Sequence, residues 1–388
     1  MVSRAIERYK VLAAGVLSLV LLIGIARFAY TPLLPIMQQQ GVLGIAAGGW
    51  LAAINYLGYL CGAIIASRIG SIVLKDKLFR AGLLLALVTT AGMGLTDNLW
   101  LWLALRFLAG LSSAAGFLLG SALILHWLMR HNYRSELGIH FSGAGLGIAV
   151  SALAAEAMQG LFDWREQWLV FSALGALLLV PSYCWLPKPS GLSRGGQELP
   201  DRPPSRQFLR LFMAAYFCAG VGFVVSATFI VAIVDQLPGL HGSGWMAFLV
   251  MGLAAAPACI LWDFIARRYG HLNALFWAFS LQIVGVLLPL FSHTLIPTLI
   301  GAALFGATFI GLVSLVLTMA GLYYPSRPAK MMGTLTIAYG IAQIMAPAIT
   351  GSVAAAGFGY NFGLLMAAAS LAIGSVIILR MRRLQAPQ

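Results

Sequence analysis

Long apolar segments recur along the whole chain, and they constrain its fold more than any other feature. A transmembrane helix needs about 20 consecutive, predominantly apolar residues to cross the hydrocarbon core of a bilayer. Twelve such segments occur, near residues 11–37, 46–67, 78–96, 99–128, 136–160, 164–186, 208–235, 244–266, 272–292, 294–323, 331–356 and 361–380. Their apolar residues do not alternate with polar ones, as the strands of a membrane barrel would require. We therefore expect an all-α membrane protein with twelve transmembrane helices.

Composition supports this expectation. Hydrophobic residues make up 61% of the 388-residue chain and charged residues 9%, whereas soluble domains contain about 25% charged residues. The four cysteines lie in apolar segments without the paired spacing of metal or redox sites, so we interpret them as packing residues and expect no metal or other cofactor. The net charge of +13 would suggest a nucleic-acid partner in a soluble protein. In a membrane protein it is typical of basic loops on one side, so we expect no nucleic-acid partner.

The charged residues assign the loops to the two sides of the membrane. If every apolar segment crosses once, nearly all of the 24 basic residues share a side with the N-terminus. The loops on the opposite side contain Asp97, Asp163, Glu166 and Asp235, together with Arg165. Because cytoplasmic loops are enriched in Lys and Arg, we expect both termini to be cytoplasmic.

One polar stretch divides the apolar segments into two sets of six. Residues 188–207, KPSGLSRGGQELPDRPPSRQ, are rich in Pro, Gly, Ser and Arg and cannot form a packed core. We interpret them as a cytoplasmic linker between an N-terminal half, 1–187, and a C-terminal half, 208–388. Similar residues recur in the two halves at a nearly constant spacing, as Trp50 and Trp245, Gly110 and Gly306, Gly138 and Gly333, and Gly145 and Gly340. The spacing covers an even number of helices, which indicates two parallel repeats.

Several motifs resemble those of the major facilitator superfamily. LALRFLAG at 103–110 is similar to its fourth-helix pattern, in which an Arg precedes a Gly by four residues. WDFIARRYG at 262–270 resembles the loop motif after the second helix of a half, which is reduced to GAIIASRIG at 62–70. GIARFAYTPLLPIM at 24–37 and VSATF at 225–229 resemble the YbfB/YjiJ branch. The resemblance covers nearly the whole chain and implies the major facilitator fold and a permease of the bacterial inner membrane.

Two arginines lie inside apolar segments, where each needs a partner. Arg at the centre of a spanning helix costs roughly 2.5–3.5 kcal/mol on insertion scales, and Arg27 and Arg106 both fall in the half of the membrane farther from the termini. We predict that they bind an anionic group of a substrate, since a guanidinium can form two parallel hydrogen bonds with a carboxylate or phosphate. A structural ion pair with Glu156, expected at similar depth, is the alternative. Glu156 is also the candidate for proton coupling, as the acid that lies well inside a span.

Neighbouring polar residues complete the predicted substrate site. Tyr30 and Thr31 follow Arg27 by three and four residues and should share its helical face, while Pro32 and Pro35 should bend the helix. Further candidates for hydrogen bonds to the substrate are Asn55, His140, Ser226, Thr228, Tyr339 and Gln343. His140 could also relay protons, and a structural bond from its ring to a backbone carbonyl is the alternative. The spacing of the repeats places Phe223 and Ala302 opposite Arg27 and Arg106, so we expect a charged N-terminal wall and a mostly apolar C-terminal wall.

These features predict a secondary active transporter that moves a small solute by alternating access of its two halves, with an amphipathic organic anion as the substrate class. Multidrug-type efflux of neutral or cationic amphiphiles stays open as an alternative. A membrane-embedded enzyme is less favoured, because the acidic residues lie almost wholly at helix ends, and we expect no enzymatic activity. Twelve spans that enclose their own cavity need no partner chain, so we expect a monomer in the lipid bilayer.

Overall fold

The computed structural model describes the chain in five ranges, which are 2–133, 136–189, 203–291, 294–324 and 328–385. All regular secondary structure within these ranges is helical. Contacts between helices divide the chain into two compact units. Unit 1 comprises Met1–Gly44 and Ile54–Ser193, and unit 2 comprises Ile45–Ala53 and Arg194–Gln388. Most of the predicted linker lies outside the described residues, so the boundaries predicted from it stay predictions.

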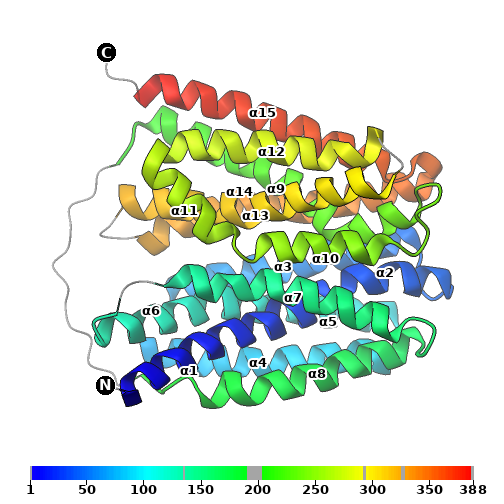
Figure 1. The fold of residues 1–388 in the computed structure, drawn as a ribbon, viewed down its shortest axis with the longest axis horizontal. Coiled ribbons are helices and arrows are strands. Elements are labelled where there is room, and N and C mark those ends of the chain that lie inside the picture. The colour runs from blue at the N-terminus through cyan, green and yellow to red at the C-terminus, as the bar shows by residue number, and fades with distance from the viewer. Residues whose placement is uncertain (1, 134–135, 190–202, 292–293, 325–327, 386–388) are drawn as a thin grey trace. The chain divides into compact units, whose positions relative to one another are not determined.

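Before and after the predicted linker, the helices follow one another along the chain with short connections (Figure 1). Those before the linker are α1 Val2–Leu19, η1 Val20–Phe28, α2 Tyr30–Gln39, α3 Ile45–Arg68, α4 Ile72–Leu95, α5 Leu99–Ala114, η2 Ala115–Gly120, α6 Ser121–Arg130, α7 Leu137–Met158 and α8 Trp164–Cys184. Those after it are α9 Arg206–Asp235, α10 Gly244–Ala255, α11 Ala258–Tyr269, α12 His271–Phe291, α13 Leu295–Tyr323, α14 Pro328–Val353, η3 Ala354–Phe358 and α15 Asn361–Gln385. The segments labelled η are π-helical.

The predicted number of spans is confirmed when one bent pair of helices counts as one span. Eleven helices of the described residues are long and apolar enough to cross a membrane, and α10 and α11 together form a further candidate, bent by 46°. The sequence predicted a single span over 244–266. Pro257 lies between the two helices and has no N–H to donate to the carbonyl four residues earlier, so the helix breaks there.

The third span begins earlier than its hydropathy indicates. We expected it to start near residue 78, but α4 starts at Ile72. Ser71 caps this end, because its Oγ accepts a hydrogen bond of 3.3 Å from Leu74 N. One turn later, Asp76 and Arg80 form a buried ion pair of 3.0 Å on the same face of the helix. The charged residues are therefore part of the helix.

Each repeat contains a close backbone contact between its first and its fifth span. In unit 1, η1 meets α7 at Gly24 and Gly147, and a Cβ atom on Gly24 would lie 2.4 Å from the Gly147 Cα atom. In unit 2, α9 meets α14 at the matching positions, and a Cβ atom on Gly220 would lie 2.8 Å from the Ala342 Cβ atom. Real Cβ atoms do not approach so closely, so both helix pairs need glycine at this point.

A second contact recurs between the second and fourth spans of each repeat. A Cβ atom on Gly110 of α5 would lie 1.9 Å from the Asn55 carbonyl oxygen of α3. In unit 2, a Cβ atom on Gly306 of α13 would lie 2.1 Å from the Met251 carbonyl oxygen of α10. Corresponding helices thus pack through corresponding residues. The predicted fold class, an all-α membrane protein of two parallel six-helix repeats, is confirmed.

Candidate functional site

A π-helical segment forms the middle of the first span. It ends where Ala29 N donates a hydrogen bond of 2.8 Å to the carbonyl oxygen of Gly24, five residues earlier. Beyond it, Pro32 has no N–H for the carbonyl oxygen of Phe28, so the regular helical pattern is not restored at once. All residues of η1 are buried. Such segments are frequent at functional sites, and this one carries Arg27 in its last turn.

Hydroxyl groups of other helices donate to carbonyl oxygens of this segment. Ser113 Oγ of α5 donates to Leu22 O over 2.8 Å, and Ser151 Oγ of α7 donates to Gly24 O over 3.0 Å. Buried carbonyl groups need such partners, particularly where helical hydrogen bonds are rearranged. The small side chains of α5 and α7 thereby fix the irregular backbone that positions Arg27.

Arg106 contacts the same backbone from α5. Its side chain is buried, and its guanidinium donates to the carbonyl oxygens of Ala26, over 3.3 Å, and Arg27, over 3.4 Å. These distances exceed the usual 2.7–3.2 Å, so the carbonyl oxygens are weak partners for the charge. The guanidinium carbon also lies 4.4 Å from the centre of the Tyr30 ring. Nε of Arg106 is buried and has no hydrogen-bond partner among the described residues.

Arg27 lies against two tyrosine rings of α3. Its guanidinium carbon is 4.5 Å from the centre of the Tyr56 ring and 4.7 Å from that of Tyr59, in the range of cation–π contacts. The residue is 7% exposed. Its Nε atom is buried and, within the described part of the chain, has no hydrogen-bond partner. The rings stabilise the cation without neutralising it.

Asn55 connects the helix that carries Tyr56 and Tyr59 to the helix that carries Arg106. Its Nδ2 atom donates a hydrogen bond of 2.8 Å to the carbonyl oxygen of Arg106, which ties α3 to α5 next to Tyr56. Asn55 is fully buried, and its Oδ1 atom accepts no hydrogen bond from any described residue. A buried acceptor in this state costs about 1–3 kcal/mol. It is therefore an unsatisfied acceptor beside the two arginines.

The two buried guanidinium groups carry like charges close to each other, and the charge of Arg27 acts on Arg106. The ion pairs recorded among the described residues join Arg8 and Glu136, Arg80 and Asp76, Arg165 and Asp97, and Arg267 and Asp263. Neither buried arginine belongs to them. Two forks of N–H donors surrounded by tyrosine rings can bind a carboxylate or phosphate attached to an apolar body.

Glu156 is half-buried on α7. Ser151 of the same helix contacts Gly24, and the first and fifth spans run in the same direction. Five residues beyond Ser151, Glu156 therefore lies at about the depth of Ala29. This depth agrees with either suggested role, and both its pairing with Arg106 and its part in proton coupling stay predictions.

The structure brings some of the predicted site residues together, but their contacts with the two arginines differ from the predicted ones. Tyr30 is buried against Arg106, whereas the rings on Arg27 come from α3. Thr31 is buried one residue beyond Tyr30. Tyr59 was not among the residues predicted from the sequence. It follows Tyr56 by three residues on one helix and so shares its face, a signal that could have identified it.

His140 lies elsewhere in unit 1. It is fully buried on α7, and a Cβ atom on Gly15 would be 2.8 Å from its Nδ1 atom. Gly15 precedes Arg27 by twelve residues in the first span, which corresponds to about 18 Å along a helix. His140 is therefore not part of the cluster around the two arginines. Both of its ring nitrogens are buried and have no hydrogen-bond partner among the described residues, so its functional and structural interpretations both stay predictions.

The candidates in unit 2 are buried, and one of them, Tyr339, belongs to an aromatic cluster. Ser226 and Thr228 are buried on α9, and Tyr339 and Gln343 on α14. The Tyr339 ring stacks on Tyr216, with 4.5 Å between ring centres. Phe223 stacks on Tyr339 and on two phenylalanines of α13, Phe305 and Phe309. Oε1 of Gln343 is buried and, among the described residues, has no hydrogen-bond partner.

Relatives in sequence are membrane transporters. The inner membrane transport protein YdhP of Escherichia coli is 24% identical over 374 residues, which cover 94% of this chain and 94% of that protein. The MFS-type transporter YceJ of Bacillus subtilis is 25% identical over 354 residues, covering 87% of this chain and 82% of its relative. These alignments span both repeats.

The fold is that of solved transporters. A crystal structure of the nucleoside transporter NupG superposes with a TM-score of 0.71 and 12% sequence identity, covering 98% of this chain and all of that one. The family model described as uncharacterised MFS-type transporter YbfB matches residues 19–379. The chain is thus a membrane transporter, and it belongs to the YbfB family of the major facilitator superfamily.

Proposed function

We propose that this protein is a secondary active transporter for an amphipathic organic anion, which binds at Arg27 and Arg106. The observation that carries the proposal is the burial of two guanidinium groups against tyrosine rings and carbonyl oxygens, outside the recorded ion pairs of the described residues. A carboxylate or phosphate bound between them would offset their repulsion and accept hydrogen bonds from both forks. Its apolar body would lie against Tyr30, Tyr56 and Tyr59.

The substrate class is inferred from these residues. NupG transports nucleosides according to its name, but at 12% identity the likeness concerns the fold. Two fixed positive charges in a medium of low dielectric constant favour an anion over a neutral or cationic ligand, because the desolvation of the arginines is offset when a negative charge binds. This favours anion transport over the multidrug alternative.

The proposal includes a location and a mechanism. The name of YdhP and the basic loops support the inner membrane with both termini in the cytoplasm. Transport would proceed by alternating access of the two halves of a monomer. Glu156, at about the depth of the arginines, would carry the coupled proton.

A thermal-shift screen tests the substrate class. Purified protein is heated with organic anions, cations and neutral amphiphiles, alongside Arg27→Gln and the control Arg165→Gln, which removes an exposed arginine paired with Asp97. Ligands that bind the folded state raise the melting temperature as their concentration exceeds Kd. We expect anions to stabilise the wild type and Arg165→Gln, and Arg27→Gln to stay folded without this shift.

Two outcomes would contradict the proposal. Equal stabilisation of all three proteins by cations or neutral amphiphiles would assign the arginines a structural role and favour multidrug-type efflux. For an anion found in the screen, counterflow in proteoliposomes then distinguishes a transporter from an enzyme, since a transporter exchanges labelled anion without changing it chemically. A modified product in place of exchange would identify an enzyme.

A further inference from the structure

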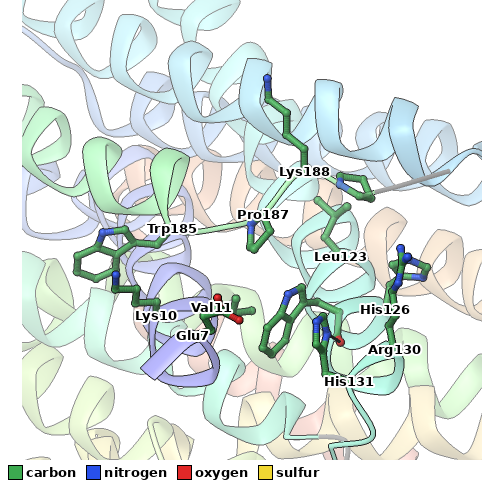
Figure 2. Close-up of a pocket in the computed structure, with 12 residues that line it drawn as sticks. Glu7, Lys10, Val11, Leu123, His126, Arg130, His131, Trp185, Pro187 and Lys188 are labelled. Atoms are coloured by element: carbon green, nitrogen blue, oxygen red, sulfur yellow. Dashed lines mark hydrogen bonds between the residues drawn. The ribbon is translucent and has the colours of Figure 1, made fainter. Parts of the chain in front are cut away.

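A cavity lined by several charged residues lies in unit 1 at the end where the chain begins, away from Arg27 and Arg106. Its volume is about 380 Å³, and its walls come from α1, α6 and the segment that follows α8. Lys10 and Trp185 lie along one side, and His126, Arg130 and His131 lie along the other (Figure 2). The substrate site proposed above does not account for this cavity.

The charge of the lining favours an anion. Three basic side chains, those of Lys10, Arg130 and Lys188, line the cavity together with a single carboxylate, Glu7. The nearby Arg8 does not contribute, because it is paired with Glu136. In addition, Nε2 of His126 is buried and has no hydrogen-bond partner among the described residues. By this count the lining of the cavity carries more positive than negative charge.

The wall formed by the segment after α8 is held in place. Arg80 of α4 donates from Nη2 to the carbonyl oxygen of Leu186 over 2.8 Å and from Nη1 to that of Tyr183. The same guanidinium is paired with Asp76 and is buried. Leu186 lies between Trp185 and the remaining lining residues of this segment. These contacts fix the segment, so the cavity is a preformed site.

The cavity lies at a boundary of the membrane. The start of the first span and the ends of the fourth and sixth meet there, and the even number of crossings between these points places them on one side. Two tryptophans line the cavity, Trp127 and Trp185, and tryptophan is enriched where the hydrocarbon core meets the headgroups. Val11 and Leu123 add an apolar surface. Basic side chains above an apolar wall match a phospholipid, whose phosphate is joined to acyl chains.

We propose that this cavity binds the phosphate group of an anionic phospholipid of the leaflet on the side of the termini. Lys10 and Arg130 contact the phosphate from opposite walls. The tryptophan rings and the apolar residues contact the glycerol and the first methylenes of the acyl chains. Basic pockets between transmembrane helices are suited to such headgroups.

Native mass spectrometry in detergent tests the proposal with three probes: cardiolipin, phosphatidylcholine of the same chain length, and inorganic phosphate. Lys10→Gln/Arg130→Gln removes two charges from the cavity. Arg382→Gln/Arg383→Gln is the matched control, since it removes two exposed arginines near the end of α15, on the same side of the membrane. A basic residue near an anionic membrane surface contributes about a fivefold gain in binding, so we expect Kd for cardiolipin to rise about 25-fold in the cavity variant and to change little in the control.

The other probes exclude simpler explanations. We expect weaker binding of phosphatidylcholine by the wild type and no binding of inorganic phosphate at the same concentration. Equal losses in both double variants would overturn the proposal in favour of unspecific attraction by net charge. Inorganic phosphate that binds as tightly as cardiolipin would overturn it in favour of a free anion. Lys10→Arg/Arg130→Lys keeps both charges and should bind cardiolipin like the wild type, which separates loss of charge from loss of folding.

Discussion

The first and seventh spans occupy equivalent places in the two repeats, yet they differ in backbone and in chemistry. The first contains the π-helical η1 and two prolines, whereas α9 is a continuous helix from Arg206 to Asp235. The positions that match Pro32 and Pro35 are Thr228 and Val231, whose N–H groups can donate within the helix. Prolines in one repeat alone thus account for the irregular backbone of that repeat.

The helices that pack against the first and seventh spans differ in a matching way. In unit 1, Ser113 of α5 donates to the carbonyl oxygen of Leu22 in η1. The matching residue of α13 is Phe309, which stacks on Phe223 of the regular α9. A π-helical segment needs donors from its surroundings, while a regular helix satisfies its own carbonyl groups and can pack against apolar rings. One scaffold therefore supports a polar site in unit 1 and an aromatic cluster in unit 2.

The largest effect on stability is expected at the two glycines that form the same helix contact in both repeats. Gly110→Val and Gly306→Val each place a side chain into a backbone carbonyl group of a neighbouring helix, where a Cβ atom has less than 2.2 Å of space. We expect both variants to lose about 3 kcal/mol or more and to yield little folded protein. Size-exclusion profiles and melting temperatures measure this. Gly44→Ala, at a glycine with nothing within 4 Å, is the control. A wild-type profile for either valine variant would contradict the shared contact.

The next largest effect, on the affinity for an anion, is expected at the position that is Arg27 in the first repeat and Phe223 in the second. Arg27→Met keeps the length of the side chain and removes the guanidinium. A hydrogen bond to a charged group contributes about 1.5–3 kcal/mol, so we expect the affinity for an anionic substrate to fall about 10- to 100-fold. Phe223→Met at the equivalent position should leave this affinity within about twofold. Calorimetric titration of both variants checks the prediction, and equal losses would show that the anion does not bind at Arg27.

Much of the fold could be predicted from the sequence, because it depends on quantities that accumulate over many residues. The length and hydropathy of each segment determine the spans, and the recurrence of glycines such as Gly110 and Gly306 indicates the repeat. The break at Pro257 was not predicted, since hydropathy continues across it. A single missing N–H is a local effect, and whether it bends or breaks a helix depends on tertiary packing.

The candidate site was predictable in its residue types but not in its contacts. Arg27 and Arg106 were identified because charge inside a span is costly. The expected alignment of Arg27 with Tyr30 assumed a regular helix, in which residues three or four apart share a face. In a π-helical segment the turn is wider, and Tyr30 instead contacts Arg106. The prolines signalled an irregularity, but only the structure shows its form.

A smaller effect, of opposite sign in the two repeats, is expected on stability. The guanidinium of Arg27 is buried beside a like charge and outside the recorded ion pairs, and burying a charge without an ion-pair partner lowers the stability of the folded protein. Arg27→Met should therefore raise the melting temperature of the ligand-free protein. Phe223→Met loses stacking with Phe309 and should lower it, by about 1 kcal/mol in unfolding free energy. Differential scanning fluorimetry gives both signs, and destabilisation by Arg27→Met would indicate a structural partner for the arginine.

The smallest effect is expected at Tyr59, whose ring contacts the guanidinium of Arg27. Tyr59→Leu removes one of two cation–π contacts of Arg27, each of which contributes about 0.5–2 kcal/mol, while Tyr56 keeps the other. A less well oriented guanidinium should bind the anion about fivefold more weakly. Tyr59→Phe preserves the ring and should bind like the wild type, as titration of the two variants with one anion would show. If phenylalanine weakened binding as much as leucine does, the hydroxyl group of Tyr59 would be the part that matters. The tyrosines around Arg27 would then act as hydrogen-bonding groups and not as aromatic partners of a guanidinium that the matching residue of unit 2, Phe223, does not provide.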